Sequence, residues 1–181
     1  MRKVLAAVMA IVMVLSSSLV MAETIEVEEN LLSVEITIPA EYFGEEDAQE
    51  RCDEYVEEGK CKDATVNEDG SVTIVMSKKQ HEEMLVETKA AVDEALVQMV
   101  ETTEDASFVS IEANEDCTEF KVILSSDTVG FMESFSAYVL YMYGGIYAAY
   151  AGTDVENIAV VFINQATNEV IETYNSADME S

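Results

Sequence analysis

The sequence predicts an α+β fold, a largely antiparallel sheet built from hairpins in the order β-α-ββ-α-ββ-α-ββ, with helices packed on one face. Short segments of alternating hydrophobicity occur in pairs around turn residues, and two of these pairs lead into segments of more than 20 residues with helical character. No Pro- or Gly-rich linker divides the chain, and Pro39 is its only proline. We therefore expect a single α+β domain over residues 31–176.

The first predicted elements are a strand and a polar helix. LLSVEITIP, residues 31–39, alternates apolar and polar residues as a half-buried strand does. The helix predicted over residues 45–58 has a narrow apolar side that includes Cys52. Gly59 follows it, and glycine is a common residue just after a helix because it accepts the left-handed conformation.

A hairpin followed by a long helix is predicted twice, at about 61–103 and 107–152. The two copies read VNEDGSVTIVMS and ANEDCTEFKVILS, and each ends in Ser before its helix. The Asp-Gly pair of the first copy supplies the positive φ that tight hairpin turns need. Because Cys117 stands where the first copy has Gly70, we expect the second turn to differ in detail.

The two long helices differ in character. The first begins with a capping-box pattern at Ser77 and Gln80 and is amphipathic. The second lies in VGFMESFSAYVLYMYGGIYAAYAG, which carries one charge, Glu133, and is apolar on all sides. We expect it to form the centre of the core, and expect Gly144-Gly145 to kink it or to let another backbone approach.

The segments near both ends of the chain complete the predicted fold. Residues 23–30 form a short acidic leader. Strands at 157–164 and 169–174 form a last hairpin around a polar turn. A disordered tail is expected at 177–181.

The N-terminal residues predict export. Arg2 and Lys3 precede an apolar run over residues 4–15, and Val-Met-Ala ends at Ala22 with small or aliphatic residues at the cleavage positions. This is the pattern of a secretory signal peptide over residues 1–22, with an uncleaved anchor as the alternative. We expect a bacterial protein that is secreted, extracellular or held at the cell envelope, with no membrane span after signal cleavage.

The chain is strongly acidic. Its 181 residues contain 37 Asp or Glu against 9 Lys or Arg, a formal charge of −28, and loss of Arg2 and Lys3 takes it to −30. Such a surface repels nucleic acid and anionic headgroups, so we expect no nucleic-acid partner. It attracts cations and basic partners.

The residues that commonly carry chemistry form no recognisable motif. His81 is the only histidine, and we interpret it as a solvated surface residue. HEEML lacks the second histidine of a zinc-binding HExxH, and one His with three scattered Cys does not suggest a zinc site. We expect no catalytic residues, no metal and no cofactor. A hydrolase that uses a pair of the many carboxylates is the remote alternative.

A group of four lysines and a pair of cysteines each allow two interpretations. The lysines could form an anion site near a helix start, or they could be ordinary surface residues. We favour the second interpretation. The four residues are Lys60, Lys62, Lys78 and Lys79. Of the cysteines, Cys52 and Cys61 are the closest pair in sequence. In an exported protein they could form a disulfide, or they could remain buried and inert thiols.

The apolar helix over residues 129–151 is the candidate site. Its flanks are acidic, so a membrane span is disfavoured. Apolar surface left over from the core could form a dimer interface or hold a ligand. The candidate residues are Met132, Phe135, Tyr138, Tyr141, Met142 and Tyr147. We expect a non-enzymatic protein that acts outside the cell by binding or structural interaction, with an unknown protein or surface partner. The alternatives are a homodimer through this helix and a carrier of a hydrophobic ligand.

The motifs resemble an uncharacterised family of small secreted or surface-anchored proteins of Gram-positive gut bacteria. The resemblance lies in KDATVNEDGSVTIVMSKKQHEEMLVE, NEDCTEFKVIL and VVFINQATNEVI, and it extends over most of the mature chain. It implies export and an α+β fold, and it assigns no activity and no site residues. Many members of the family look lipid-anchored, whereas this chain has no Cys near the cleavage site.

Overall fold

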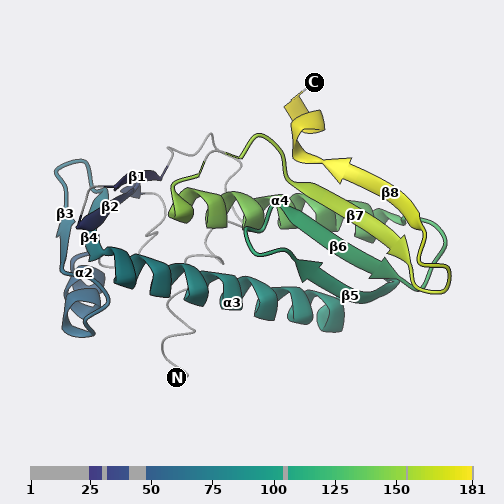
Figure 1. The fold of residues 1–181 in the computed structure, drawn as a ribbon, viewed down its shortest axis with the longest axis horizontal. Helices are drawn as coiled ribbons and strands as arrows, with labels where there is room; N and C mark the ends of the chain where they lie inside the picture. Colours follow the sequence, from purple (N-terminus) through teal and green to yellow (C-terminus); the bar gives the residue numbers. More distant parts are fainter. Residues whose placement is uncertain (1–24, 30–31, 41–47, 104–105, 154, 181) are drawn as a thin grey trace. The chain divides into compact units, whose positions relative to one another are not determined.

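The predicted α+β class is confirmed. The structure, a computed structural model, describes residues 25–29, 32–40, 48–103, 106–153 and 155–180. These residues form three α-helices and eight strands, arranged in two four-stranded, mostly antiparallel sheets (Figure 1). The signal peptide predicted at 1–22 lies outside the described residues.

The chain divides into two compact units, and the boundaries fall inside two helices. The helices are α3 (Lys78–Thr102) and α4 (Phe131–Ala151), so each contributes residues to both units. Unit 1 is Met1–Thr88 with Ala149–Thr153, and unit 2 is Lys89–Ala148 with Asp154–Ser181. That both units fold as the single domain expected over 31–176 stays a prediction.

Unit 1 contains an antiparallel sheet in the order β1-β2-β4-β3, with α2 against β3 and β4 (Figure 1). Alternate residues of β2 and β4 are buried, as their sequence alternation predicts. Cys52 is the buried residue of α2. The elements are β1 (Glu26–Glu29), β2 (Ser33–Ile38), α2 (Ala48–Glu57), β3 (Asp63–Val66) and β4 (Val72–Ser77).

The acidic leader contains a strand that the sequence did not predict. β1 pairs with β2 in antiparallel register, with Glu26 opposite Thr37 and Glu29 opposite Val34. Three of its four residues are Glu, which sequence patterns assign to a solvated segment. Charged residues are common on edge strands, where they prevent pairing with a further chain.

Unit 2 contains a sheet in the order β5-β6-β7-β8. β5–β6 and β7–β8 are antiparallel hairpins, whereas β6 and β7 are parallel because α4 crosses over between them. After β8 the chain ends in the short 3-10 helix η3 (Ser176–Glu180) where a disordered tail was expected. The strands are β5 (Phe108–Ala113), β6 (Glu119–Leu124), β7 (Ala159–Asn164) and β8 (Val170–Asn175).

The core of unit 2 lies between one face of this sheet and two helices. Residues of α3 and α4 pack with alternate residues of β6 and β7, which are almost fully buried. The largest contributors are Leu96, Phe120, Leu124, Leu140 and Phe162. α4 was expected to form the centre of the core, but only one of its faces lies there, because Phe131, Phe135 and Tyr138 on another side are exposed.

The turn between β3 and β4 is held by its own polar groups. The Gly70 amide donates to the Asn67 carbonyl at 3.1 Å, and Gly70 has a φ of 86°. The Asp69 carboxylate accepts hydrogen bonds from the amide and hydroxyl of Ser71 at 3.0 and 2.7 Å. The Ser71 bonds lower the pKa of this carboxyl.

The turn between β5 and β6 repeats these bonds. The Cys117 amide donates to the Asn114 carbonyl at 3.3 Å, and Asp116 accepts bonds from Thr118. Cys117 adopts the left-handed conformation of Gly70, with a φ of 55°. The expected difference in detail is confirmed at the closing bond: Asn67 donates to the Ser71 carbonyl, whereas Asn114 donates one residue further, to Glu119.

Gly144 is the point where α4 meets this second turn. A Cβ built on Gly144 would lie 2.5 Å from the Cys117 carbonyl oxygen and 2.8 Å from Cδ1 of Ile158. The adjacent Gly145 has no atom within 4 Å of such a Cβ. The predicted approach of another backbone to this glycine pair is therefore confirmed at Gly144.

The two adjacent glycines give a matched test. Gly144→Ala should destabilise the protein by about 1–3 kcal/mol, because a backbone oxygen cannot yield as a flexible side chain can. Gly145→Ala should stabilise it by up to about 1 kcal/mol, through the helix preference of alanine. Denaturant unfolding of both variants measures this, and equal effects of the two substitutions would contradict the close contact.

Candidate functional site

The candidate residues predicted on α4 lie on different sides of the helix. Tyr141 and Tyr147 are half-buried and pack against the core of unit 2. Burial raises the pKa of Tyr147, and Cys117 lies near enough to contribute. The other four are exposed: Met132, Phe135, Tyr138 and Met142.

The sequence interpretation missed the most exposed of these apolar residues, Phe131, at 81%. Phe131, Phe135, Tyr138 and Met142 are spaced by four, three and four residues, which places them along one side of a helix. We call these four residues the aromatic face. Their spacing is visible in the sequence, but a helix apolar on all sides does not show which stripe is exposed.

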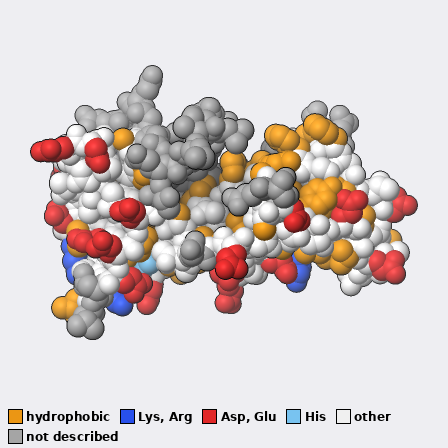
Figure 2. Space-filling view, turned by 90° about the horizontal axis from the view of Figure 1, so that it is seen from above, with side chains coloured by type: hydrophobic (Ala, Val, Ile, Leu, Met, Phe, Trp, Pro, Cys, Tyr) orange, Lys and Arg blue, Asp and Glu red, His pale blue; other side chains and the backbone are white. Residues whose placement is uncertain are grey.

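The three rings of the aromatic face form a continuous row. The Phe131 and Phe135 rings stack with centroids 6.4 Å apart, and the Phe135 and Tyr138 rings lie at 6.2 Å. The Tyr138 ring meets Tyr141 edge-on at 6.3 Å. Figure 2 shows hydrophobic side chains gathered in several groups on the side of the surface that carries β5 to β8.

The one charged residue of α4 is directed into the protein. Glu133 is buried, and one carboxylate oxygen accepts bonds from the amide and hydroxyl of Ser107, each at 2.7 Å. Burial raises the pKa of Glu133, but hydrogen bonds from Ser107, together with those from the Glu133 and Gly130 backbone, lower it further, so the pKa falls below its usual value. A Cβ on Gly130 would lie 2.6 Å from the other oxygen, so glycine there leaves room for the carboxylate.

One flank of the aromatic face is formed by β8 and η3. The hydroxyl groups of Ser134 and Tyr174 lie 3.1 Å apart and join α4 to β8. Burial, followed by the charge of Asp178, raises the pKa of Tyr141 to about 12. Glu172 likewise acts to raise the pKa of Tyr174, so acidic side chains lie along this flank.

The interpretation of His81 as a solvated residue is wrong. His81 is 6% exposed, and its Nε2 lies 2.8 Å from the Tyr150 carbonyl oxygen, both within unit 1. Because a carbonyl only accepts, Nε2 carries the proton and donates it. The sequence hides this role, since its partner is a backbone atom 69 residues away.

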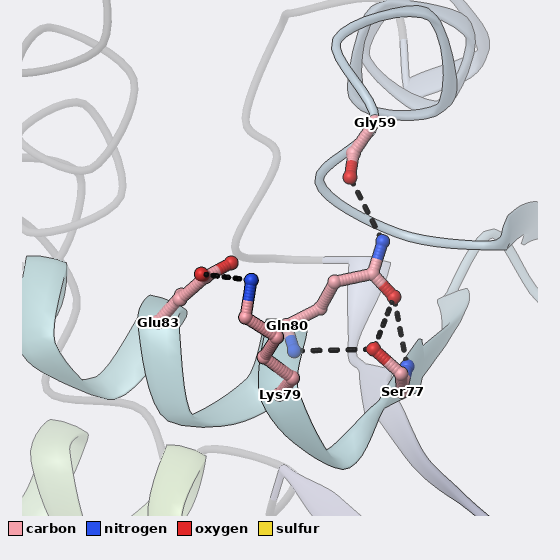
Figure 3. Close-up of polar contacts among 5 residues, drawn as sticks. All are labelled: Gly59, Ser77, Lys79, Gln80 and Glu83. Atoms are coloured by element: carbon pink, nitrogen blue, oxygen red, sulfur yellow. Dashed lines mark hydrogen bonds and ion pairs between the residues drawn. The ribbon is translucent and has the colours of Figure 1, made fainter.

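The four lysines near the start of α3 are occupied by neighbouring groups. Figure 3 shows Lys79 paired with Glu83 at 3.0 Å and the predicted capping box formed by Ser77 and Gln80. The Gln80 side chain also donates to the Gly59 carbonyl at 2.8 Å, which ties α3 to the end of α2 (Figure 3). Elsewhere Lys60 pairs with Glu58 and Glu87, Lys78 pairs with Glu29, and Lys62 donates to the Leu32 carbonyl. These contacts favour the interpretation as ordinary surface lysines.

All three cysteines are buried free thiols in the structure. Burial raises the pKa of Cys52 and of Cys61. Nearby carboxylates add to the shift, Asp53 and then Asp63 at Cys52, and Asp63 at Cys61. Cys52 also contributes to the shift at Cys61, so the two thiols are neighbours. Their disulfide stays a prediction. Burial raises the pKa of Cys117 to about 11, which makes it a poor nucleophile.

Among the residues that the structure describes, no helix combines the length and apolarity needed to cross a membrane. No group of three His, Cys, Asp or Glu among them is arranged to hold a metal ion. Comparisons with protein-family models, with curated proteins and with solved structures found no match.

The exposure of the aromatic face predicts which substitutions the fold tolerates. Phe135→Ser and Tyr138→Ser should change the free energy of unfolding by no more than about 0.5 to 1 kcal/mol, as for surface sites. Leu140→Ala, on the core face of the same helix, should cost about 2–5 kcal/mol. Urea titration of the three variants checks this, and a loss at Phe135 as large as that at Leu140 would contradict the assignment of faces.

The disulfide has a direct test. The exported protein is purified without reductant, denatured and alkylated with iodoacetamide. A bond between Cys52 and Cys61 predicts that peptide mass spectrometry finds only Cys117 alkylated, because the other two sulfurs carry no thiol. Alkylation of all three cysteines would rule the bond out.

Proposed function

We propose that this chain is an exported bacterial protein that acts outside the cell or at the envelope, by binding another protein through the aromatic face of α4. It catalyses no reaction. Export is supported by the charged and apolar segments of residues 1–22 and by the cleavage pattern at Ala22. The acidic composition is consistent with exclusion of nucleic acids as partners.

The aromatic face carries this proposal. Phe131, Phe135 and Tyr138 are each more than half exposed, and Met142 continues the row. Contiguous exposed apolar surface is unusual on a monomer and marks sites of interaction. Phe, Tyr and Met are enriched in protein–protein interfaces, where rigid rings bury large areas at low entropic cost.

The polar groups support a binding role because they are used to build the fold. Glu133 fixes the start of α4 on Ser107, and His81 holds the end of α4 through the Tyr150 carbonyl. Asp69 and Asp116 each hold a hairpin turn. These hydrogen bonds stabilise the fold, and proton transfer at the same groups would break them.

We also propose a relation to the family of small secreted or surface-anchored proteins that the motifs resemble. Within the chain, the segments at about 61–103 and 107–152 are copies of one hairpin-helix unit. Matching turn bonds in the two hairpins support this: Asp69 and Asp116 accept corresponding hydrogen bonds, and Gly70 and Cys117 share the left-handed conformation.

Export and binding can be tested together in a Gram-positive host. The full chain should appear outside the cytoplasm with Glu23 as its first residue, as read by intact mass. A photo-crosslinking amino acid at position 135 should give a defined adduct with a host protein. The same group at Glu112, an exposed position on β5, is the matched control.

The possible results of this experiment distinguish binding through the aromatic face from its absence. An adduct at position 135 that is absent at position 112, and absent when Phe131 and Tyr138 are both replaced by Ser, supports binding through this face. Equal adducts at both positions, or none at position 135, would contradict it. Retention of residues 1–22 on a cytoplasmic protein would contradict export.

A further inference from the structure

The spacing of the aromatic face fits one kind of partner surface. Phe131, Phe135, Tyr138 and Met142 are followed three residues on by exposed Gly145, which continues the four-three pattern. This alternation keeps apolar side chains in line against a second helix. The five positions extend over about 21 Å of α4, enough for three to four turns of a partner helix.

The face itself is free of charge, and the rest of unit 2 is acidic. Unit 2 contains 17 Asp or Glu against two lysines, Lys89 and Lys121. Both lysines are paired with neighbouring carboxylates: Lys89 lies 2.6 Å from Asp93, and Lys121 lies 3.5 Å from Glu119. Residues 122–181, which include the aromatic face and β8, contain no Lys or Arg.

Acidic side chains lie beside the apolar row. Glu172 and Tyr174 lie on the same side of β8, opposite the buried Phe162 and Val160, and the Tyr174 hydroxyl contacts Ser134 of α4. Asp178 lies in η3, directly after β8, and its charge adds to the raised pKa of Tyr141. Both acidic side chains are exposed. An apolar stripe with an acidic flank is the complement of a helix with an apolar stripe and basic flanks.

We propose that the partner of this chain presents a cationic amphipathic α-helix, with apolar residues at four-three spacing and Lys or Arg on its flanks, which docks along Phe131 to Gly145. This inference rests on the proposed function and names the partner's chemistry. The apolar stripe covers the aromatic face, and the basic flank meets Glu172 and Asp178.

Charge argues against the other occupants. A second copy of the chain would bring an equally acidic unit against this one, because a two-fold contact uses the same surface of both subunits. Anionic lipid headgroups would face the same repulsion. Only a basic partner gains from the field around the aromatic face.

Designed peptides test this directly, because the chain contains no Trp and a Trp in the peptide reports binding by its own fluorescence. Three peptides of about 21 residues are compared. The first is helical with apolar residues in register and Lys flanks. The second has the same composition with the apolar residues out of register. The third has the register of the first with Glu flanks.

The first peptide should bind at least tenfold more tightly than the second and the third. Its affinity should fall as NaCl rises from about 50 to about 500 mM, since flank charges are screened. Phe131→Ser combined with Phe135→Ser should weaken it at least tenfold. Val97→Ser, at an equally exposed apolar position on α3, should leave it unchanged.

Several outcomes would overturn the proposal. Equal binding of the first and second peptides would show attraction by charge alone, and equal binding of the third would remove the charge requirement. A dimer in sedimentation that the Phe131 and Phe135 substitutions dissociate would assign the face to a second copy. Binding to phosphatidylcholine vesicles that the same substitutions abolish would assign it to lipid.

Failure of this inference is distinguishable from failure of the proposed function. If the first peptide does not bind but the crosslink at position 135 forms, the partner binds the aromatic face with another structure. If neither is observed, the aromatic face is not a protein-binding surface.

Discussion

The arrangement of unit 2 depends on how α4 is rotated about its own axis. A helix that is apolar on nearly every side has no polar stripe to direct one face outward, so hydrophobicity alone leaves its rotation undetermined. Two contacts determine it. Gly144 lies against the Cys117 carbonyl, where no side chain fits, and Glu133 is bonded to Ser107 at the other end of the helix. With both contacts made, Leu140 is in the core and Phe135 is in solvent.

The contact at Gly144 also bears on the unusual backbone at Cys117. The turn between β5 and β6 needs a left-handed residue, and the side chain placed there is buried under α4. A glycine would satisfy the turn, as Gly70 does in the first hairpin, but it would leave the core without the thiol. The turn and the helix are thus adapted to each other: a strained residue on one side is matched by a residue without a side chain, Gly144, on the other.

Much of the fold follows from local pattern. The hairpins, the capping box at Ser77 and the close approach at Gly144 were predictable because the signal lies within a few neighbouring residues. β1 was not predictable, because its three glutamates give no indication that it pairs with β2. Nor was the burial of His81, since its partner is the distant Tyr150 carbonyl. The candidate site was predicted at the level of the helix, and Phe131 was missed because selecting the exposed stripe requires the contacts of Gly144 and Glu133.

The contacts of Gly144 and Glu133 hold the aromatic face in solvent. Hydroxyl-radical footprinting of the purified chain, read by peptide mass spectrometry at low protein concentration, measures side-chain exposure along α4. If these contacts set the rotation of α4, oxidation is rapid at Phe131, Phe135 and Tyr138 and slower at Tyr147, and Leu140 is protected. Protection of Phe131 and Phe135, with oxidation at Leu140 and Tyr147, would mean that α4 is rotated and that another face is available for binding.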